Sequence, residues 1–332
     1  MRHACSGLAA LLGLLLGCSS VGSRCDPLEI AQTILLPSVE GGFDLMAVDL
    51  VGRRLFVAAE DNNTVEVLDL DRGEGVRSVG GIQEPKWVVY RPETHKLYVA
   101  SGGTGAVKVI DSRTFEELLS IPFKEKANNL RFDPRTALLY VGVGKTFGAI
   151  GVIDTQTDQI SGTLALAAFP KQFELERAGN RIFVNVPSER HVAVLDRSSG
   201  RTIATWAVKE AMGNIPMALD ETSRRLYIGC ESVVLVVLDT ETGRPVASVV
   251  IDQGPDGVYV DSRRRLIYIS CASGYLDVIR PQGSDRYERI SRIATAPGAA
   301  TSLWVPELDG LFLAVPKRGT EPAAIRLYRP SP

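Results

Sequence analysis

One phrase of about eighteen residues recurs along this chain and constrains its fold more than any other feature. In LYVASGGTGAVKVIDSRT, residues 97–114, an aromatic residue stands among apolar ones, a small polar turn follows, and a second apolar alternation closes on Asp111. Aligned on the aromatic residue, the phrase occurs seven times at spacings of 41 to 44 residues. The seven aromatic residues are Phe56, Tyr98, Tyr140, Phe183, Tyr227, Tyr268 and Phe312. A repeat of this period indicates an array of similar supersecondary units.

Each repeat contains four short stretches of alternating or β-branched residues, which is typical of β-strands. In the second repeat they are WVVY, KLYVAS, AVKVID and ELLSIPF. The stretches are separated by recognisable turns, such as DTETG, in which Asp239 begins the turn and Gly243 is expected to have a positive φ. No stretch shows a convincing helical period of 3.6. Four strands in each of seven repeats predict an all-β protein, a seven-bladed β-propeller.

The two ends of the chain complete each other in this prediction. The seventh repeat, from Ser302 onward, runs out after its third strand, whereas LEIAQTILL, residues 28–36, precedes the first repeat as an orphan strand. We therefore expect the N-terminal strand to complete the last blade and close the ring. This closure would cover an edge that could otherwise pair with other chains. One propeller domain is predicted over residues 28–330.

The phrases KLYVASGGTGAVKVIDSRT and GAIGVIDTQTDQISGTLAL resemble the YVTN-type repeats of YncE-like seven-bladed propellers. The resemblance spans essentially the whole chain after the N-terminal segment, and it specifies fold better than function. It implies an exported bacterial propeller, and most such proteins bind ligands that have not been assigned. It also implies single-stranded DNA binding for some members, with lactonases and haem-carrying domains as more distant relatives.

The N-terminal segment MRHACSGLAALLGLLLGCSS has one Arg followed by an apolar run up to Leu16. This run is about half of the ~20 residues that a membrane span requires, so it indicates a secretory signal over residues 1–17. The letters LLGC resemble the lipobox of bacterial lipoproteins, although Leu16 departs from the small residue usual there. The resemblance implies a lipid anchor at Cys18, a short tether over residues 18–27 and, from Ser19, the outer membrane facing the periplasm. Plain secretion with nearby cleavage and an uncleaved anchor are the alternatives.

The remaining cysteines and histidines indicate no reactive site. Cys230 and Cys271 each lie three residues after the aromatic residue of their repeat, so their side chains should point the same way in two different sheets. A disulfide requires converging Cβ atoms and Cα atoms within about 7 Å, so we expect buried free thiols. His95 is expected on a turn between strands and His191 in a loop on the opposite face. Neither has the neighbours of a zinc site, a haem ligand pair or a catalytic triad, and no metal or cofactor is predicted.

A Gly-Lys-Thr sequence occurs in GVGKTFG, residues 142–148. Leu139 stands where a phosphate-binding loop requires glycine, and a strand follows where a helix is needed. We expect a loop between the second and third strands of the third blade. The turns of one face carry Arg and Lys residues together with the Asp residues that close each repeat, which predicts a solvated, ion-paired rim.

The loops that lead into the innermost strands are where propellers usually bind ligands. About twelve residues before each aromatic residue, the mouth positions are Asp44, Lys86, Asn128, Lys171, Ile215, Asp256 and Ala300. Blades two to four provide a polar, cationic arc of Lys86, Asn128, Asn129, Lys171 and Gln172, with Trp87 as a stacking surface. Deeper in the channel, Arg131 and Glu174 occupy equivalent positions of neighbouring blades and are expected to pair. The arc suits a small anionic or amide-bearing ligand, or the end of an extended polymer.

These features predict a non-enzymatic, monomeric scaffold of the bacterial envelope that binds a protein or a small polar or anionic ligand. A lactonase-like hydrolase is the first alternative; it would use Arg131, Glu174 and Glu176, and Asp44 with Asp256 could at most begin a divalent-metal site. Single-stranded nucleic-acid binding is the second. It is disfavoured by the formal net charge of −2, and because Trp87 is the one aromatic residue expected on the mouth ring.

Overall fold

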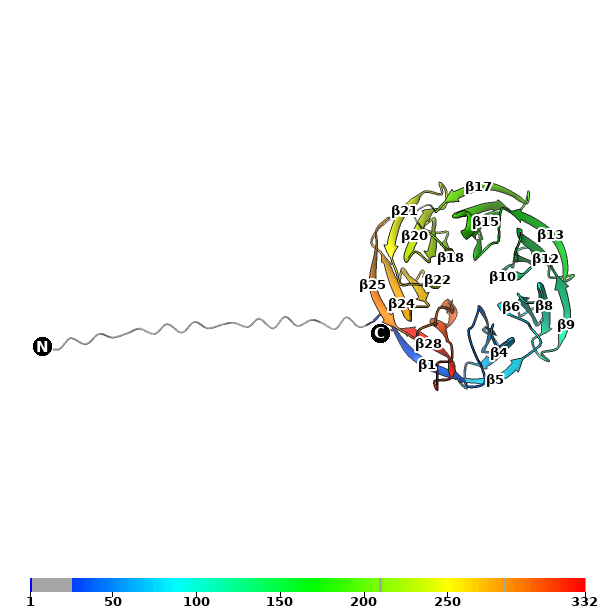
Figure 1. The fold of residues 1–332 in the computed structure, drawn as a ribbon, viewed down its shortest axis with the longest axis horizontal. Helices are drawn as coiled ribbons and strands as arrows, with labels where there is room; N and C mark the ends of the chain where they lie inside the picture. Colours follow the sequence, from blue (N-terminus) through cyan, green and yellow to red (C-terminus); the bar gives the residue numbers. More distant parts are fainter. Residues whose placement is uncertain (2–25, 209–210, 284, 332) are drawn as a thin grey trace.

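Seven four-stranded antiparallel sheets stand in a ring around a central channel, as Figure 1 shows. The computed structural model describes residue 1 and residues 26–208, 211–283 and 285–331; the predicted signal segment and the lipidation site Cys18 lie outside these residues. The prediction of an all-β, seven-bladed propeller is confirmed. No helix within the described ranges is long and apolar enough to cross a membrane.

Each of the first six blades is formed by four consecutive strands, running from the channel outward. Blade one has β2 (Met46–Asp49), β3 (Arg54–Ala59), β4 (Thr64–Asp69) and β5 (Glu74–Val79), and blade two has β6 (Pro85–Arg91), β7 (Lys96–Ser101), β8 (Ala106–Asp111) and β9 (Glu117–Pro122). Blade three has β10 (Ala127–Asp133), β11 (Leu138–Gly144), β12 (Gly148–Asp154) and β13 (Gln159–Leu166), and blade four has β14 (Phe173–Leu175), β15 (Arg181–Val186), β16 (His191–Asp196) and β17 (Arg201–Ala207). Blade five has β18 (Asn214–Asp220), β19 (Arg225–Cys230), β20 (Val234–Asp239) and β21 (Pro245–Val250), and blade six has β22 (Pro255–Asp261), β23 (Leu266–Cys271), β24 (Tyr275–Pro281) and β25 (Tyr287–Ala294).

Blade seven joins the two ends of the chain. Its inner strands are β26 (Ser302–Val305), β27 (Gly310–Val315) and β28 (Ala323–Pro330), and its outermost strand is β1 (Leu28–Leu36). The strands β1 and β28 pair antiparallel, with Leu28 opposite Pro330 and Leu36 opposite Ala323. The predicted closure of the ring by the N-terminal strand is therefore confirmed.

The repeated phrase forms the packing between blades. The second and third strands of each blade are buried on both faces, as the continuous burial of β3 and β7 illustrates. The repeat aromatic residues lie in these interfaces; Phe56 of blade one, for example, packs in one cluster with Val88 and Val99 of blade two. The outermost strands instead alternate between exposed and half-buried residues, as in β17. One blade cannot bury both of its faces, so the apolar repeat stabilises the ring only when neighbouring blades are present.

The ring has two different faces. We call the side with the loops leading into the innermost strands the mouth face, and the opposite side, with the turns that follow the first and third strands, the turn face. The turns that follow the third strands have the predicted hydrogen bonds. In blade five, Asp239 Oδ1 accepts from the backbone N–H groups of Glu241 and Thr242 at 3.1 and 2.9 Å, and Gly243 has φ +68°. A side chain at that φ would be strained, which accounts for the glycine.

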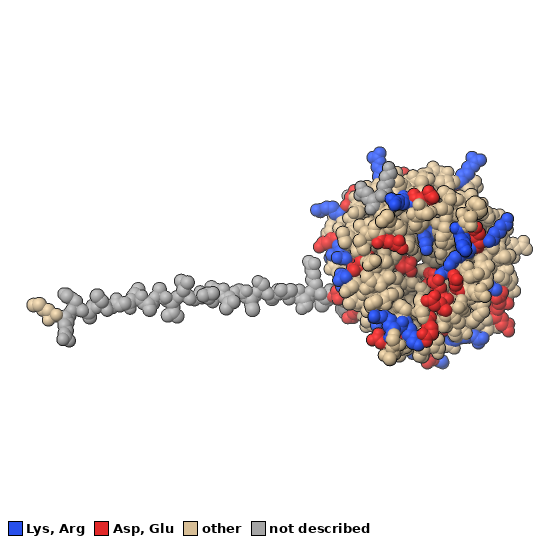
Figure 2. Space-filling view, viewed as in Figure 1, with Lys and Arg blue, Asp and Glu red and all other residues tan. Residues whose placement is uncertain are grey.

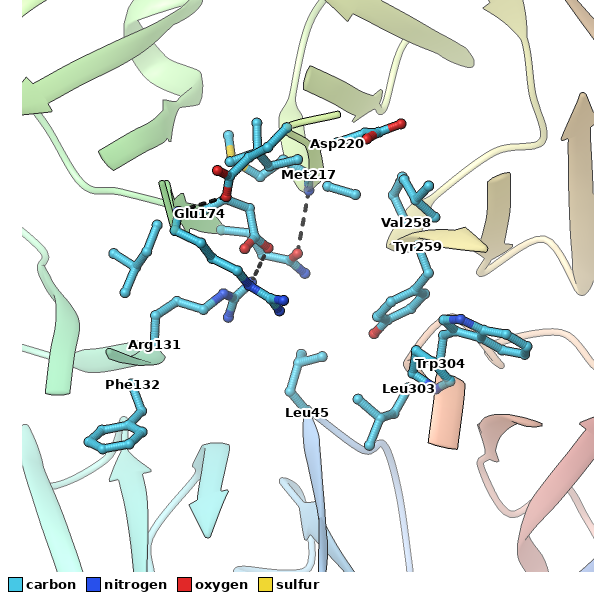
Figure 3. A pocket seen from close by; sticks show the side chains of 18 of the residues that line it. Leu45, Arg131, Phe132, Glu174, Met217, Asp220, Val258, Tyr259, Leu303 and Trp304 are labelled. Atoms are coloured by element: carbon cyan, nitrogen blue, oxygen red, sulfur yellow. Dashed lines mark hydrogen bonds and ion pairs between the residues drawn. The ribbon is translucent and has the colours of Figure 1, made fainter. Parts of the chain in front are cut away.

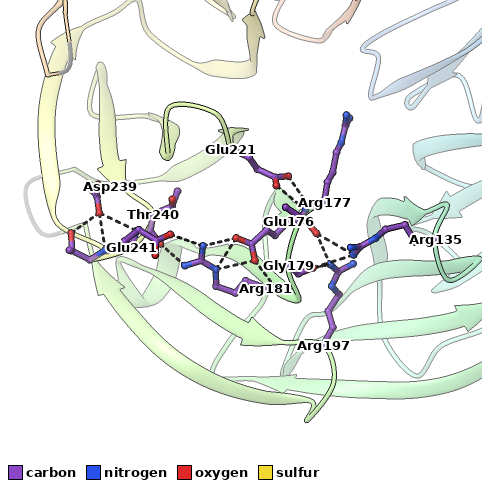
Figure 4. A network of polar contacts seen from close by, with 12 residues as sticks. Arg135, Glu176, Arg177, Gly179, Arg181, Arg197, Glu221, Asp239, Thr240 and Glu241 are labelled. Carbon is purple, nitrogen blue, oxygen red and sulfur yellow. Dashed lines mark hydrogen bonds and ion pairs between the residues drawn. The ribbon is translucent and has the colours of Figure 1, made fainter.

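The turn face carries the predicted ion pairs, and many of them join neighbouring blades. Arg225 lies 2.9 Å from Asp239 in its own blade and 2.8 Å from Asp285 in the next. In Figure 4, Arg181 similarly bridges Glu176 of blade four and Glu241 of blade five. Positive and negative side chains are interspersed over the face drawn in Figure 2, so that face has no single sign of charge.

Most of the smaller sequence predictions hold, with one correction. Cys230 and Cys271 are free and buried, and His95 lies between β6 and β7. The Gly-Lys-Thr segment leads into the loop between β11 and β12, in which the backbone N–H groups of Lys145, Thr146 and Phe147 donate to Glu125 Oε2 at 2.5 to 3.2 Å. The prediction of a loop at His191 is wrong, because this residue begins β16 and pairs with Ala207 after the short 3-10 turn η1 (Pro187–Glu189). A second such turn, η2 (Pro306–Leu308), lies in blade seven.

Candidate functional site

Two cavities lie along the central channel. The first, of about 290 Å³, opens among the loops of the mouth face, and we call it the mouth pocket. Its lining residues are Phe43, Asp44, Leu45, Glu60, Lys86, Lys126, Asn128, Asn129, Phe169, Lys171, Gln172, Ile215 and Asp256. The second, of about 940 Å³, follows the innermost strands down to turns of the turn face, and we call it the channel cavity.

The structure divides the predicted site residues between these cavities. The mouth pocket contains five of them, namely Lys86, Asn128, Asn129, Lys171 and Gln172. The channel cavity contains Trp87, Arg131 and Glu174, together with the other face of Gln172. The five polar residues predicted from blades two to four therefore lie together in the mouth pocket, whereas Trp87, Arg131 and Glu174 lie in the other cavity.

Leu45 and Gln172 line both cavities and form a partition between them. Both side chains are buried. Gln172 reaches across the channel, since its Nε2 donates to the carbonyl oxygen of Asp256 at 2.9 Å and its Oε1 accepts from the backbone N–H of Met217 at 3.4 Å. The side chain thus connects blade four to blades five and six.

The mouth pocket contains both carboxylates and ammonium groups, and most are paired. Lys86 Nζ pairs with the carboxylate of Glu60 and lies 4.0 Å from Asp44 Oδ2. Asp256 Oδ2 accepts from Thr301 Oγ1 at 3.1 Å. Lys171 differs: its Nζ lies 5.8 Å from the centre of the Phe169 ring, and it has no ion-pair partner among the residues that the structure describes.

Burial controls the titration of this pocket. Burial raises the pKa of Asp44 well above its ordinary value, the Asp256 carboxylate raises it further, and Lys86 and Lys171 oppose both effects. Burial also raises the pKa of Asp256, against the Thr301 hydroxyl and the two lysines. The pKa of Lys86 is lowered chiefly by burial, against the attraction of Asp44. Each group is thus poorly hydrated, and a ligand that supplies hydrogen bonds or an opposite charge would replace lost hydration.

The channel cavity contains the ion pair that the sequence predicts. Arg131 Nη2 lies 2.8 Å from Glu174 Oε1, and the Arg131 guanidinium stands 4.1 Å from the centre of the Trp87 ring. Figure 3 shows Arg131 and Glu174 on one side of the cavity, with Tyr259 and Trp304 across from them. The expected pairing across neighbouring blades is confirmed.

The placement of Trp87 on the mouth ring is wrong. Residues two apart in a strand share a face, and Trp87 shares with Val89 the face of β6 that lines the channel cavity. A register shift between Pro85 and Trp87 sets Lys86 apart from this alternation and leaves it in the mouth pocket. The stacking surface predicted for a ligand at the mouth therefore lies below the partition.

Sequence reasoning missed two groups of residues. Tyr259 lies nine residues before its repeat aromatic, at the position that holds Arg131 and Glu174 in other blades, so the repeat alignment contained the signal for it. Its hydroxyl donates to the carbonyl oxygen of Ser302. Glu60 and Phe169, by contrast, come from loops outside the aligned positions, and the repeat carries no signal for them.

Several residues considered for hydrolysis do not meet in the structure. Glu176 lies on the turn face and pairs with Arg181 at 2.5 Å, outside both cavities. The two histidines of the propeller line neither cavity. Within the described residues, no three His, Cys, Asp or Glu side chains form a group that could hold a metal ion, so Asp44 and Asp256 do not belong to such a group.

Comparison with solved structures identifies the fold. A chain of the hydrazine synthase of Kuenenia stuttgartiensis matches with a TM-score of 0.75 and 17% identity, over 88% of this chain and 97% of that chain. A chain of a mitotic checkpoint complex matches with a TM-score of 0.75 and 16% identity, over 98% of both chains. No family model and no curated protein matches the sequence. Since 1834 solved chains match, the likeness shows a widely used fold and assigns no activity.

Proposed function

We propose that this protein is a non-enzymatic binding propeller whose mouth pocket takes a small polar ligand with one anionic group. The observation that supports this most is Lys171, an ammonium group that lines the pocket without an ion-pair partner among the described residues. The other lysines are paired, Lys86 with Glu60 and Lys126 with Glu84 at 2.9 Å. An anionic group on the ligand would complete the pairing at the remaining position.

The other lining residues favour a ligand with hydroxyl or amide groups beside the anionic one. The Asn128 side chain has no hydrogen bond to any described residue, and it can both donate and accept. Burial raises the pKa values of Asp44 and Asp256, which favours the protonated carboxyl, a group that can both donate hydrogen bonds to hydroxyl groups and accept them. The half-buried Phe169 ring provides an apolar surface next to Lys171. A pocket of about 290 Å³ is suited to a single sugar acid or a ligand of similar size.

The predicted location is part of the same proposal. We infer an exported protein of the YncE-like type, anchored by a lipid at Cys18 and facing the periplasm, in which the mouth face meets its ligand or a partner protein. The first described residues support the geometry of such a tether. Pro27 lies at the turn face, where its carbonyl oxygen accepts from the Ser331 N–H at 3.1 Å, so the anchor would leave the mouth face turned away from the membrane.

The alternatives have less support from the residues. A hydrolase would need a nucleophile, a base or a metal site in a cavity; in the channel cavity Glu174 is paired with Arg131, and the described residues contain no group of three such side chains that could hold a metal ion. Binding of single-stranded nucleic acid would need stacking surfaces at the mouth, and Trp87 lies below the partition.

Thermal unfolding with three matched sugars tests the proposal. Glucuronate, glucose and glucosamine share one ring and differ in charge, and a ligand that binds only the folded protein raises its unfolding temperature. We expect glucuronate to stabilise the protein most and glucosamine least, and the Lys171→Ala variant to lose the glucuronate response. Lys124→Ala is the matched control, because Lys124 is exposed and lines neither cavity.

Three results would contradict the proposal. Equal stabilisation of wild type and Lys171→Ala by glucuronate would place the site elsewhere. Stronger stabilisation by glucosamine than by glucuronate would show that the carboxylates, and not Lys171, select the ligand. Absence of any response in all three sugars would leave the mouth pocket without a small ligand of this class.

A further inference from the structure

The channel cavity has walls of a kind different from those of the mouth pocket. Its volume of about 940 Å³ lies within the range of about 300–1,000 Å³ usual for sites that bind organic molecules. The equivalent apolar position of blades three to seven contributes Phe132, Leu175, Leu219, Val260 and Trp304 to its wall. Leu45 and Gln172 separate it from the mouth pocket, and its lining extends to turn-face residues such as Glu221 and Ser262.

An ion pair lies between these apolar residues. Arg131 and Glu174 pair at 2.8 Å, and their side chains are only 17% and 25% exposed. The Arg131 guanidinium also stacks on Trp87 and donates to the carbonyl oxygen of Leu130 at 3.0 Å. Glu174 Oε2 and Arg131 Nε make no hydrogen bond to other described residues, so one acceptor and one donor remain for a ligand.

The positive charge of Arg131 and the negative charge of Glu174 cancel, and this favours an uncharged ligand. A charged ligand would lose its hydration among apolar walls without finding an unpaired opposite charge. At the opening, the Glu221 carboxylate accepts from the backbone N–H groups of Arg177 and Ala178, and the Arg177 side chain is exposed (Figure 4). The Asp220 carboxylate also lines the opening, where it accepts from the N–H groups of Thr222 and Ser223, so an anionic ligand meets carboxylates that outnumber the one guanidinium there. An uncharged molecule with a hydrogen-bonding group loses the least on entry.

We propose that the channel cavity is a second ligand site, entered from the turn face, for an uncharged ring compound that bears one hydrogen-bonding group. The rings of the ligand would lie against the apolar wall and the rings of Trp87 and Tyr259, and its polar group would contact Arg131 and Glu174. This site is independent of the mouth pocket, and either one can fail without the other.

Two fluorescent probes of nearly the same shape test the site. N-phenyl-1-naphthylamine is uncharged and has one N–H donor, and 8-anilino-1-naphthalenesulfonate adds a sulfonate to the same skeleton. Trp87 and Trp304 line the cavity, whereas the third tryptophan, Trp206, lies in the outermost strand β17. We expect saturable binding of the uncharged probe with energy transfer from tryptophan, at least tenfold tighter than binding of the sulfonate. The Trp206→Phe variant should keep most of this transfer and Trp87→Phe with Trp304→Phe should lose it.

Two variants separate this cavity from other apolar surfaces. Leu175→Phe with Leu219→Phe fills the cavity from neighbouring blades and should weaken binding of the uncharged probe at least tenfold, whereas Lys171→Ala in the mouth pocket should leave it unchanged. Glu174→Gln leaves the Arg131 charge unpaired, so it should reverse the preference in favour of the sulfonate. Unchanged binding in the filled variant, or a wild-type preference for the sulfonate, would overturn the proposal, as would the absence of saturable binding. A cooperative unfolding transition in each variant shows that it is folded.

Discussion

Ile34 and Leu35 are neighbours in the closing strand β1, and they offer a direct test of how the ring is held shut. Ile34 is 1% exposed and packs into the interface of blades seven and one with Val57, Phe312 and Ile325. Leu35 is 57% exposed on the opposite side of the strand. We therefore expect Ile34→Ala to destabilise the protein strongly and Leu35→Ala to have almost no effect.

The expected size follows from the burial. Removing a fully buried isoleucine side chain to alanine costs about 2–5 kcal/mol, which includes the cavity that it leaves. With an unfolding entropy of about 2.1 cal/mol/K per residue over about 300 residues, this loss lowers the unfolding temperature by about 3–8 °C. For the exposed Leu35, the change should stay within about 0.5 kcal/mol, or about 1 °C.

Differential scanning calorimetry of the two variants beside wild type measures both quantities. A chain that begins at Pro37, and so lacks β1, extends the test; it should fail to give a monomeric folded protein, because it exposes the edge of β28 and the apolar side of blade seven. The reasoning is refuted if Ile34→Ala and Leu35→Ala shift the transition equally, or if the truncated chain unfolds at the wild-type temperature.

Three further predictions concern polar groups inside the ring. Gln172→Ala removes the side chain that forms the partition and leaves buried backbone groups without partners, so urea titration should show a loss of about 1–3 kcal/mol. Burial raises the pKa of Asp277 to about 6, so its protonated carboxyl stabilises the fold fully below about pH 4, and this contribution is lost as the pH rises through 6. Between pH 4 and 7, the free energy of unfolding of Asp277→Asn should therefore rise by about 3 kcal/mol relative to that of wild type. The same pH dependence in both proteins would contradict this. Arg197→Ala leaves the buried carboxylate of Asp133 without its partner at 2.6 Å and should lower the free energy of unfolding by about 3 kcal/mol. Arg53→Ala, at an exposed pair, should lower it by less than about 1 kcal/mol. Equal losses in guanidinium titrations would contradict the assigned burial.

The fold could be predicted from the sequence because the same strand pattern occurs seven times. The alternation of apolar residues around each repeat aromatic fixes strands, and its period of 41 to 44 residues fixes the blade. The seventh repeat lacked a fourth strand, and residues 28–36 form that strand beside β28. Errors came where the repeat breaks, as at His191, where a 3-10 turn replaces the expected loop and the strand begins earlier.

The site was less predictable because ligand-facing positions depend on local irregularities. The alignment located the mouth positions and the Arg131–Glu174 pair, which depend only on strand register. It could not show that the Gln172 side chain donates to the backbone carbonyl of Asp256, because that contact joins blade four to blade six, which are not neighbours in the sequence. The division of one channel into two cavities follows from this side chain and from Leu45, and no repeat pattern encodes it.

The closing strand β1 has a mechanical consequence. It begins at Leu28 on the turn face and ends at Leu36 on the mouth face, paired with β28 along its length. Its backbone hydrogen bonds are perpendicular to the strand, so a force between the N-terminus and a partner held at the mouth would load them all together in shear. A pull across the strand would instead open them one at a time. A propeller held by its N-terminus would therefore resist traction best along the axis of its own channel.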